Sequence, residues 1–203
     1  MQAVPLPKSD SAVKLTFDRE HGLSLEAYLA FCREHPDLRV ERTAGGEIIF
    51  MPPAGGESSN RSLKVAIQLA AWAESHGGQV FDSSVEFILR DGSALSPDAS
   101  WLSDDALRSI PRQKRKQFLR VAPEFVVEVR SPSDRLKSAK EKMELWIANG
   151  VELAWLIDAD RETVYVYRKR KPVRTVRGVS ELTGEGPVAG FVLRMGPIWR
   201  GLG

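Results

Sequence analysis

The sequence predicts one α/β domain with a mixed central sheet and flanking helices. The first indication is an apolar strand at 124–130 that is followed by a helical pattern at about 134–149 and a second strand, "LAWLID", at 153–158. The second is "LRVERTAGGEIIFMPP", two short strands around a Gly-Gly turn, which is a hairpin signal. The chain contains no internal repeat and no low-complexity linker that would divide it.

Helix and strand signals follow one another along the chain. Residues 1–22 mix Pro, Lys, Asp and Ser and predict a flexible arm, whereas residues 23–203 predict a single domain. Ser24 caps an expected helix at about 25–35, which Pro36 closes. The other expected elements, in order, are the hairpin at 38–53, a helix within 55–78 with apolar residues at helical spacing (Leu63, Ile67, Ala70, Ala71), strands within 79–84, 85–90 and 95–102, an irregular basic stretch at 104–120, the strand–helix–strand segment, a strand at 163–169 and one or two C-terminal strands.

Composition sets limits on the function. The net charge of +2 on 203 residues does not make the whole molecule attract nucleic acid, so local cationic clusters must do so if it binds any. The single cysteine, Cys32, excludes an internal disulfide and zinc sites built from several thiolates. No signal peptide and no apolar run of membrane-spanning length is visible, so we expect a cytoplasmic protein.

Two acidic residues stand at the ends or edges of apolar strands. Asp98 follows proline in "SPDASWL", and Glu128 interrupts "FVVEVR". A carboxylate in such a run is costly unless it is paired or binds a metal. Two carboxylates on neighbouring strands are able to hold a hard divalent cation through oxygen ligands. Spacing alone leaves the alternative open, a strand-terminal aspartate and a salt-bridged glutamate.

Longer segments resemble a known family. "SPDASWL" and, thirty residues on, "PEFVVEVRSPSDRLKSAKEKMELWIANGVELAWLIDADRETVYVYR" resemble the Uma-type family of putative restriction endonucleases, in the PD-(D/E)XK nuclease superfamily. The upstream "GGEIIFMPPAGGESSNRSLKVAIQL" fits the hairpin-then-helix opening of that family, and the likeness covers about residues 24–195. The resemblance implies a restriction-endonuclease-like fold with additional hairpins, a divalent metal (Mg²⁺ or Mn²⁺) and phosphodiester hydrolysis.

The resemblance also assigns roles to residues. It implies that Asp98 and Glu128 are the metal-binding and catalytic carboxylates. The superfamily pattern places a lysine two residues after Glu128, but Arg130 stands there, which binds phosphate but cannot act as a base. The family position for the displaced lysine is Lys142. Glu57, at the start of the second helix, is either a further metal ligand or a glutamate favoured by the helix dipole.

The residue pattern alone does not decide which cationic side chain acts at the expected site. On a helical wheel Lys142 and Lys140 lie on opposite flanks of one apolar face, so only the resemblance favours Lys142, and Lys140 remains a candidate substrate contact. Arg130 is two residues from Glu128 on the same strand, so both side chains are expected to face alike. Arg130 is therefore expected to clamp a phosphate or to pair with Glu128.

The function expected from these residues is metal-dependent endonuclease activity on DNA. The alternative is a non-catalytic module that binds nucleic acid or protein on a nuclease-like fold, which the arginine at position 130 motivates. A homodimer is expected because cutting both strands calls for two active sites across a duplex. The exposed-looking strands of the second sheet and the apolar C-terminal "FVLRMGPIWRGLG" are the expected interface.

Overall fold

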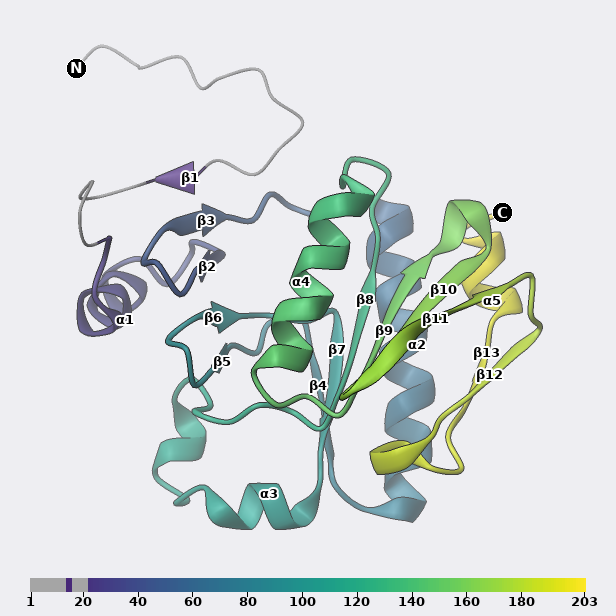
Figure 1. Cartoon of the computed structure of the whole chain (residues 1–203). Coiled ribbons are helices and arrows are strands. Elements are labelled where there is room, and N and C mark those ends of the chain that lie inside the picture. Colours follow the sequence, from purple (N-terminus) through teal and green to yellow (C-terminus); the bar gives the residue numbers. More distant parts are fainter. Residues whose placement is uncertain (1–13, 16–21) are drawn as a thin grey trace.

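The central sheet is mixed, as predicted, and has the order β11-β10-β9-β8-β7-β4 in a computed structural model that describes residues 14–15 and 22–203 (Figure 1). Only β8 and β9 run parallel, and the other pairs in this sheet are antiparallel. Its strands are β4 (Gln79–Asp82), β7 (Ala99–Leu102), β8 (Phe125–Val129), β9 (Leu153–Asp158), β10 (Thr163–Arg168) and β11 (Lys171–Arg177).

One helix covers each face of the central sheet (Figure 1). Alternate side chains of β8 point to opposite faces of the sheet. Val127 packs in the cluster that contains Val65 of α2 (Gly56–His76). Val126 packs instead with Met143 of α4 (Leu136–Ala148), the helix that connects β8 to β9. Glu128 has the same parity as Val126 and therefore lies on the α4 face.

A second layer of strands stands beside this sheet, built mainly from the predicted hairpin. Its order is β1-β3-β2-β6-β5. Its elements are β1 (Lys14–Leu15), α1 (Leu25–Glu34), β2 (Val40–Arg42), β3 (Ile48–Phe50), β5 (Phe87–Ile88) and β6 (Ala94–Leu95). We call α1 and these five strands the N-terminal lobe. The predicted arm at 1–22 lies outside the described residues except for β1 and Gly22.

The predicted strand at 95–102 is two strands in two sheets. β6 ends at Leu95 and β7 begins at Ala99, so Pro97 and Asp98 lie in the connection between them. Proline supplies no N–H to a ladder, which accounts for the break. The chain thereby passes from the N-terminal lobe to the central sheet at Asp98.

Most apolar residues of the C-terminal segment are buried within the domain and are not available for an interface, whereas Val192 and Leu202 are exposed. Phe191 and Ile198 are 1% and 0% exposed and belong to the core cluster on the α2 face. The remaining elements are α3 (Asp104–Ser109), the short 3-10 helices η1 (Lys114–Lys116), η2 (Ala159–Arg161) and η3 (Gly186–Val188), β12 (Glu181–Thr183), β13 (Val192–Arg194) and α5 (Gly196–Arg200). No helix in the described part of the chain is long and apolar enough to cross a membrane.

Helix α2 buries a different face from the one its apolar spacing indicates. Leu63 and Ile67 are 55% and 57% exposed, whereas Arg61 is only 5% exposed. The buried stripe is Ser58, Arg61, Val65, Leu69 and Ala73. Arg61 is accommodated because the Ile198 carbonyl and two carboxylates accept its hydrogen bonds.

We predict that Phe191→Ala lowers the free energy of unfolding by about 3–5 kcal/mol, the usual cost of truncating a buried phenylalanine. The Phe191 ring stacks on Trp155, with ring centroids 5.9 Å apart, and lies 5.9 Å from the Trp72 ring. Urea denaturation measures the change. Val192→Ala, one residue on and 42% exposed, is the control and should cost little. Equal losses in the two variants would contradict this packing.

Candidate active site

Asp98 and Glu128 meet because β7 and β8 are neighbours in the sheet. The antiparallel register pairs Ala99 with Val127, so continuing the ladder by one residue brings Asp98 level with Glu128. The Asp98 Oδ2 atom accepts a hydrogen bond of 2.7 Å from the Val129 N–H, which fixes the aspartate against the end of β8. The two predicted carboxylates thus lie side by side, Asp98 directly before the first residue of β7 and Glu128 near the last residue of β8.

Glu128 is held by two side chains one helical turn apart on α4. Its Oε1 atom accepts a hydrogen bond of 3.0 Å from the Trp146 indole N–H. The same oxygen lies 3.0 Å from the Lys142 ammonium. The Glu128 side chain is 14% exposed, so these donors offset most of the cost of placing it in an apolar strand.

Lys142 is the centre of a buried cluster of charges. Its Nζ atom donates to Glu41 Oε1 at 2.8 Å and to the Ser96 carbonyl at 3.0 Å, in addition to the Glu128 contact. Three acceptors match the three N–H groups of an ammonium, whereas a neutral amine has only two. Lys142 is therefore a protonated cation in this arrangement.

Lys140 lies elsewhere and does not contact this cluster. Its Nζ atom is 4.1 Å from the centre of the Tyr165 ring, a cation–π contact on β10. Of the two lysines that the helical wheel left open, the structure brings only Lys142 to Glu128. The orientation of α4 on the sheet decides which lysine reaches Glu128, and a helical wheel gives no information on that orientation.

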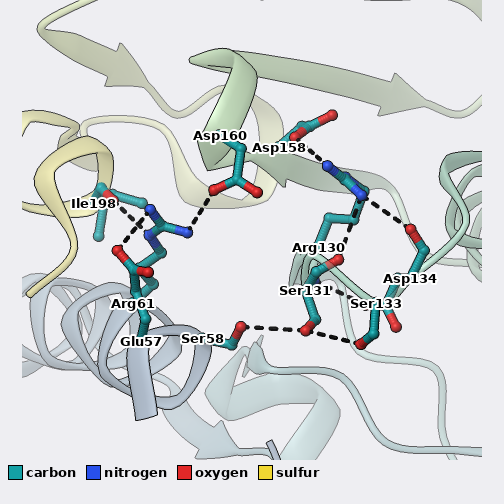
Figure 2. A network of polar contacts seen from close by, with 10 residues as sticks. All are labelled: Glu57, Ser58, Arg61, Arg130, Ser131, Ser133, Asp134, Asp158, Asp160 and Ile198. Carbon is teal, nitrogen blue, oxygen red and sulfur yellow. Dashed lines mark hydrogen bonds and ion pairs between the residues drawn. The ribbon is translucent and has the colours of Figure 1, made fainter. Parts of the chain in front are cut away.

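Arg130 lies beside the cluster but does not pair with Glu128. Its guanidinium donates to Asp158 Oδ1 at 3.0 Å and to the Asp134 carbonyl at 2.9 Å (Figure 2). Asp158 is 0% exposed, and a buried carboxylate is costly without a cationic partner, so Arg130 pairs with Asp158 and not with Glu128. The guanidinium thereby ties the loop after β8 to the end of β9.

Glu57 belongs to a separate group at the start of α2. Its Oε1 atom accepts from Arg61 at 3.0 Å, and Arg61 also donates to Asp160 at 3.1 Å (Figure 2). The structure does not bring Glu57 to Asp98 or Glu128. Ser58, one residue on, contacts Ser131 at 3.4 Å, which joins α2 to the loop after β8.

Glu41 is a site residue that the sequence reasoning missed. It lies on β2, is 4% exposed, and its Oε1 atom accepts from both Lys142 and the Ser96 N–H, the latter at 3.0 Å. The available signal was weak, because "LRVE" at 38–41 alternates apolar and charged residues as a half-exposed hairpin does. Only the contact with α4, 101 residues away, shows that Glu41 points inward.

Burial raises the pKa values of the carboxyl groups in this cluster. Burial raises the pKa of Glu128 to about 7, although the Lys142 ammonium acts in the opposite direction. The pKa of Asp98 is also raised by burial, against the Val129 N–H and the Lys142 charge. For Lys142, burial lowers the pKa but Glu128 and Glu41 raise it, and the net direction is upward.

The donor set fits a hard divalent cation bound by few protein ligands. Asp98, directly before β7, and Glu128, on β8, offer carboxylate oxygens side by side. Among the described residues, no group of three or more His, Cys, Asp or Glu side chains is placed to hold a metal ion. Mg²⁺ commonly binds through one or two carboxylates and keeps several waters, so two ligands are compatible with it.

Comparisons with known proteins identify the family and the fold of the chain. The family model described as "Uma2: Putative restriction endonuclease" matches residues 25–196. The chain belongs to this family. The Uma2 match runs from the first residue of α1 through β13 to the first residue of α5, and it includes every residue of the cluster described above.

A solved structure has the same fold as this Uma2 protein. It is the crystal structure of a putative nuclease belonging to DUF820 from Anabaena variabilis ATCC 29413, 20% identical in sequence. The similarity has a TM-score of 0.73 and covers 87% of this chain and 97% of that chain. No curated protein matches the chain. The fold is therefore restriction-endonuclease-like, and the family supports a nuclease-like function.

We predict that Glu86→Gln stabilises the protein at alkaline pH and not at acidic pH. Glu86 is 6% exposed, its Oε1 atom contacts the Tyr28 hydroxyl, and Glu41 is the neighbouring carboxylate. Burial raises the pKa of Glu86 from 4.5 to about 7. Because the folded state binds the Glu86 proton more tightly than the unfolded state, this proton contributes its full stability at pH values below the unfolded pKa. The contribution is lost as the pH rises through the folded pKa of about 7. Glutamine stays neutral, so the variant should gain up to about 3 kcal/mol above pH 7.

Chemical denaturation of both proteins between acidic and alkaline pH measures this difference. Glu74→Gln, an exposed position on α2, is the control and should give a curve parallel to that of the parent. A Glu86→Gln curve that also runs parallel would contradict the buried, proton-binding state of Glu86.

Proposed function

We propose that this Uma2 protein is a metal-dependent endonuclease that hydrolyses phosphodiester bonds in DNA. The observation that carries the proposal is the meeting of Asp98, Glu128 and Lys142 at one edge of the sheet. Two acidic ligands and one ammonium are the groups that such hydrolysis requires. They come from two neighbouring strands and from the helix that follows the second.

Asp98 and Glu128 are the proposed ligands of Mg²⁺ or Mn²⁺. When bound, the ion lowers the pKa of a water ligand and neutralises charge on the phosphodiester. Both carboxylates are fixed before any ion arrives, Asp98 by the Val129 N–H and Glu128 by the Trp146 indole. Such preorganisation keeps the ligand oxygens in place during the reaction. Glu57, engaged with Arg61, is not included in this proposed metal site.

Lys142 supplies positive charge beside these carboxylates and does not act as a base, because its three N–H groups are those of an ammonium. We assign it the stabilisation of charge that develops on the phosphate or the orientation of the attacking water. Glu41 positions the ammonium from the opposite side to Glu128. The N–H that faces Glu128 is the one nearest to a bound substrate.

The remaining parts of the proposal concern substrate and assembly. Arg130 lies on the rim of the site and is the proposed phosphate contact, even though Asp158 already holds part of its guanidinium. Lys140, on Tyr165, is more remote and contributes at most to general attraction of DNA. The homodimer stays a prediction that sedimentation velocity checks, and the exposed Leu63 and Ile67 of α2 now replace the buried C-terminus as its candidate contact. A cytoplasmic location likewise stays a prediction.

We predict that Lys142→Met abolishes DNA cleavage while Lys140→Met leaves it nearly unchanged. Both changes remove one ammonium from the same helix, but only Lys142 contacts Glu128. The loss expected from removing one charge-stabilising group is about 10²–10³-fold in turnover. Plasmid nicking under single-turnover conditions measures it. Normal cleavage by Lys142→Met would overturn the assignment of this lysine.

We predict that Mn²⁺ raises the melting temperature of the parent protein and that Asp98→Asn removes this increase. An ion that binds only the folded state stabilises it by mass action. Differential scanning fluorimetry across a manganese titration measures the shift, which does not require activity. Glu57→Gln is the matched control and should keep the shift, because Glu57 contacts Arg61. A manganese response that survives in Asp98→Asn, or is absent from the parent, would favour the non-catalytic binding module.

A further inference from the structure

A cavity of about 440 Å³ opens directly beside the candidate active site. Glu128, Lys142 and Glu41 form part of its wall, so the cavity and the charged cluster are continuous. It lies between the N-terminal lobe and α4, with residues of the central sheet at its base. Pockets of roughly 300–1,000 Å³ are the usual size of small-molecule sites in proteins.

The walls of this cavity are mainly apolar and come from opposite sides. Ile49 and Met51 line it from β3 and the residue that follows, and Leu145 lines it from α4. Leu95 and Leu156 belong to the two sheets. Ile49 is the ladder partner of Glu41, which faces Lys142, so that face of the hairpin is turned toward the cavity. Two opposed apolar walls suit a flat, weakly polar ring and do not suit a phosphate.

The size of the cavity restricts what reaches Glu128 and Lys142 through it. The side chains of Glu128 and Lys142 are only 14% and 20% exposed. Stacked base pairs do not fit in a volume of about 440 Å³, whereas a single nucleoside does. A phosphodiester therefore approaches these groups most directly when its own nucleotide has left the stack, as in enzymes that act on extruded nucleotides.

Cationic groups lie on the rim of the same cavity. Arg130 and Arg135 both line it, and Arg135 is exposed, with no carboxylate partner among the described residues. Guanidinium groups bind phosphate oxygens bidentately. Asp134 and Glu141 also line the cavity, so phosphate binding falls to the two guanidinium groups, which are suited to the backbone on either side of a nucleotide whose base lies between the apolar walls.

We propose that this cavity binds the base of one unpaired nucleotide next to the phosphodiester that is cut. The inference rests on the proposed nuclease function and specifies its substrate class: single-stranded, mismatched or otherwise unpaired DNA in preference to an intact duplex. Extruding a base from a duplex costs a few kcal/mol, and this cost is lowest where the base is already unpaired. The preference for unpaired DNA follows from this difference in extrusion cost between paired and unpaired bases.

The test compares three DNA ligands by fluorescence anisotropy: a fully paired hairpin, the same hairpin with one extrahelical 2-aminopurine nucleotide, and a single strand. Calcium replaces magnesium, and recovery of intact DNA is checked afterwards. The parent protein should bind the two unpaired ligands about tenfold or more tightly than the paired hairpin, since about 1.4 kcal/mol of avoided extrusion is tenfold in affinity. The 2-aminopurine emission should also change on binding.

Ala139→Leu is the test variant because Ala139 lines the cavity on α4, and leucine adds volume there without an aromatic ring that could stack on DNA. It should remove the preference and the change in emission, while affinity for the paired hairpin stays within about twofold. Ala70→Leu, the same change at an exposed position of α2, is the control and should retain both.

Each other outcome overturns the proposal. Equal affinity of the parent for paired and unpaired DNA, or a preference that survives Ala139→Leu, would mean that the cavity holds no base, whether it is empty or takes another ligand, and would leave the nuclease proposal intact. Absence of binding to all three ligands, together with absence of cleavage, would overturn the nuclease function as well.

Discussion

The Lys142 ammonium, held between Glu41 and Glu128, is the interaction on which the rest of the site depends. Its three acceptors come from β2, β8 and the connection between β6 and β7, so one side chain of α4 joins the N-terminal lobe to the central sheet. Removing one member of such a group leaves an uncompensated buried charge, which is more costly than the pair is favourable. The arrangement therefore fixes where the hairpin stands relative to α4, and this separation defines the adjoining cavity.

The balance of charge in this region explains why it suits a further cation. Three buried or nearly buried carboxyl groups, Asp98, Glu128 and Glu41, interact with the Lys142 ammonium, and a fourth, Glu86, interacts with Glu41. Burial raises the pKa of both Glu128 and Glu86 to about 7, so protonation is one way of reducing the excess negative charge. A divalent ion at Asp98 and Glu128 is another, and it uses the two groups that lie at the end of the strands. Glu86 has a hydroxyl partner in Tyr28, which makes it the group suited to remain protonated.

The parts of this structure that follow from local pattern could be predicted, and those that depend on distant contacts could not. The β8–α4–β9 unit has strong apolar runs and a clear helix between them, so its type and order are readable from sequence. The choice between Lys140 and Lys142 requires the position of Tyr165 and Glu128 around α4. The inward direction of Glu41 requires α4 itself. The apolar spacing predicts that α2 is a helix but does not identify its buried face, because it gives no account of Arg61, whose burial depends on Glu57, Asp160 and the Ile198 carbonyl.

The position of the lysine on a helix also accounts for the use of arginine at 130. A single lysine at position 130 would have to contact both Glu128 and the groups that Arg130 now contacts, which are Asp158 and the loop after β8. With Lys142 approaching Glu128 from α4, the side chain at 130 is available to satisfy Asp158, which is fully buried on β9. Arginine suits that position because its guanidinium donates to Asp158 and to the Asp134 carbonyl at once, which lysine's single nitrogen does less well. The same contacts fix the loop at 131–135, which carries Arg135 on the rim of the cavity. Substituting lysine at 130 would therefore restore the superfamily spacing but loosen the loop that frames the site.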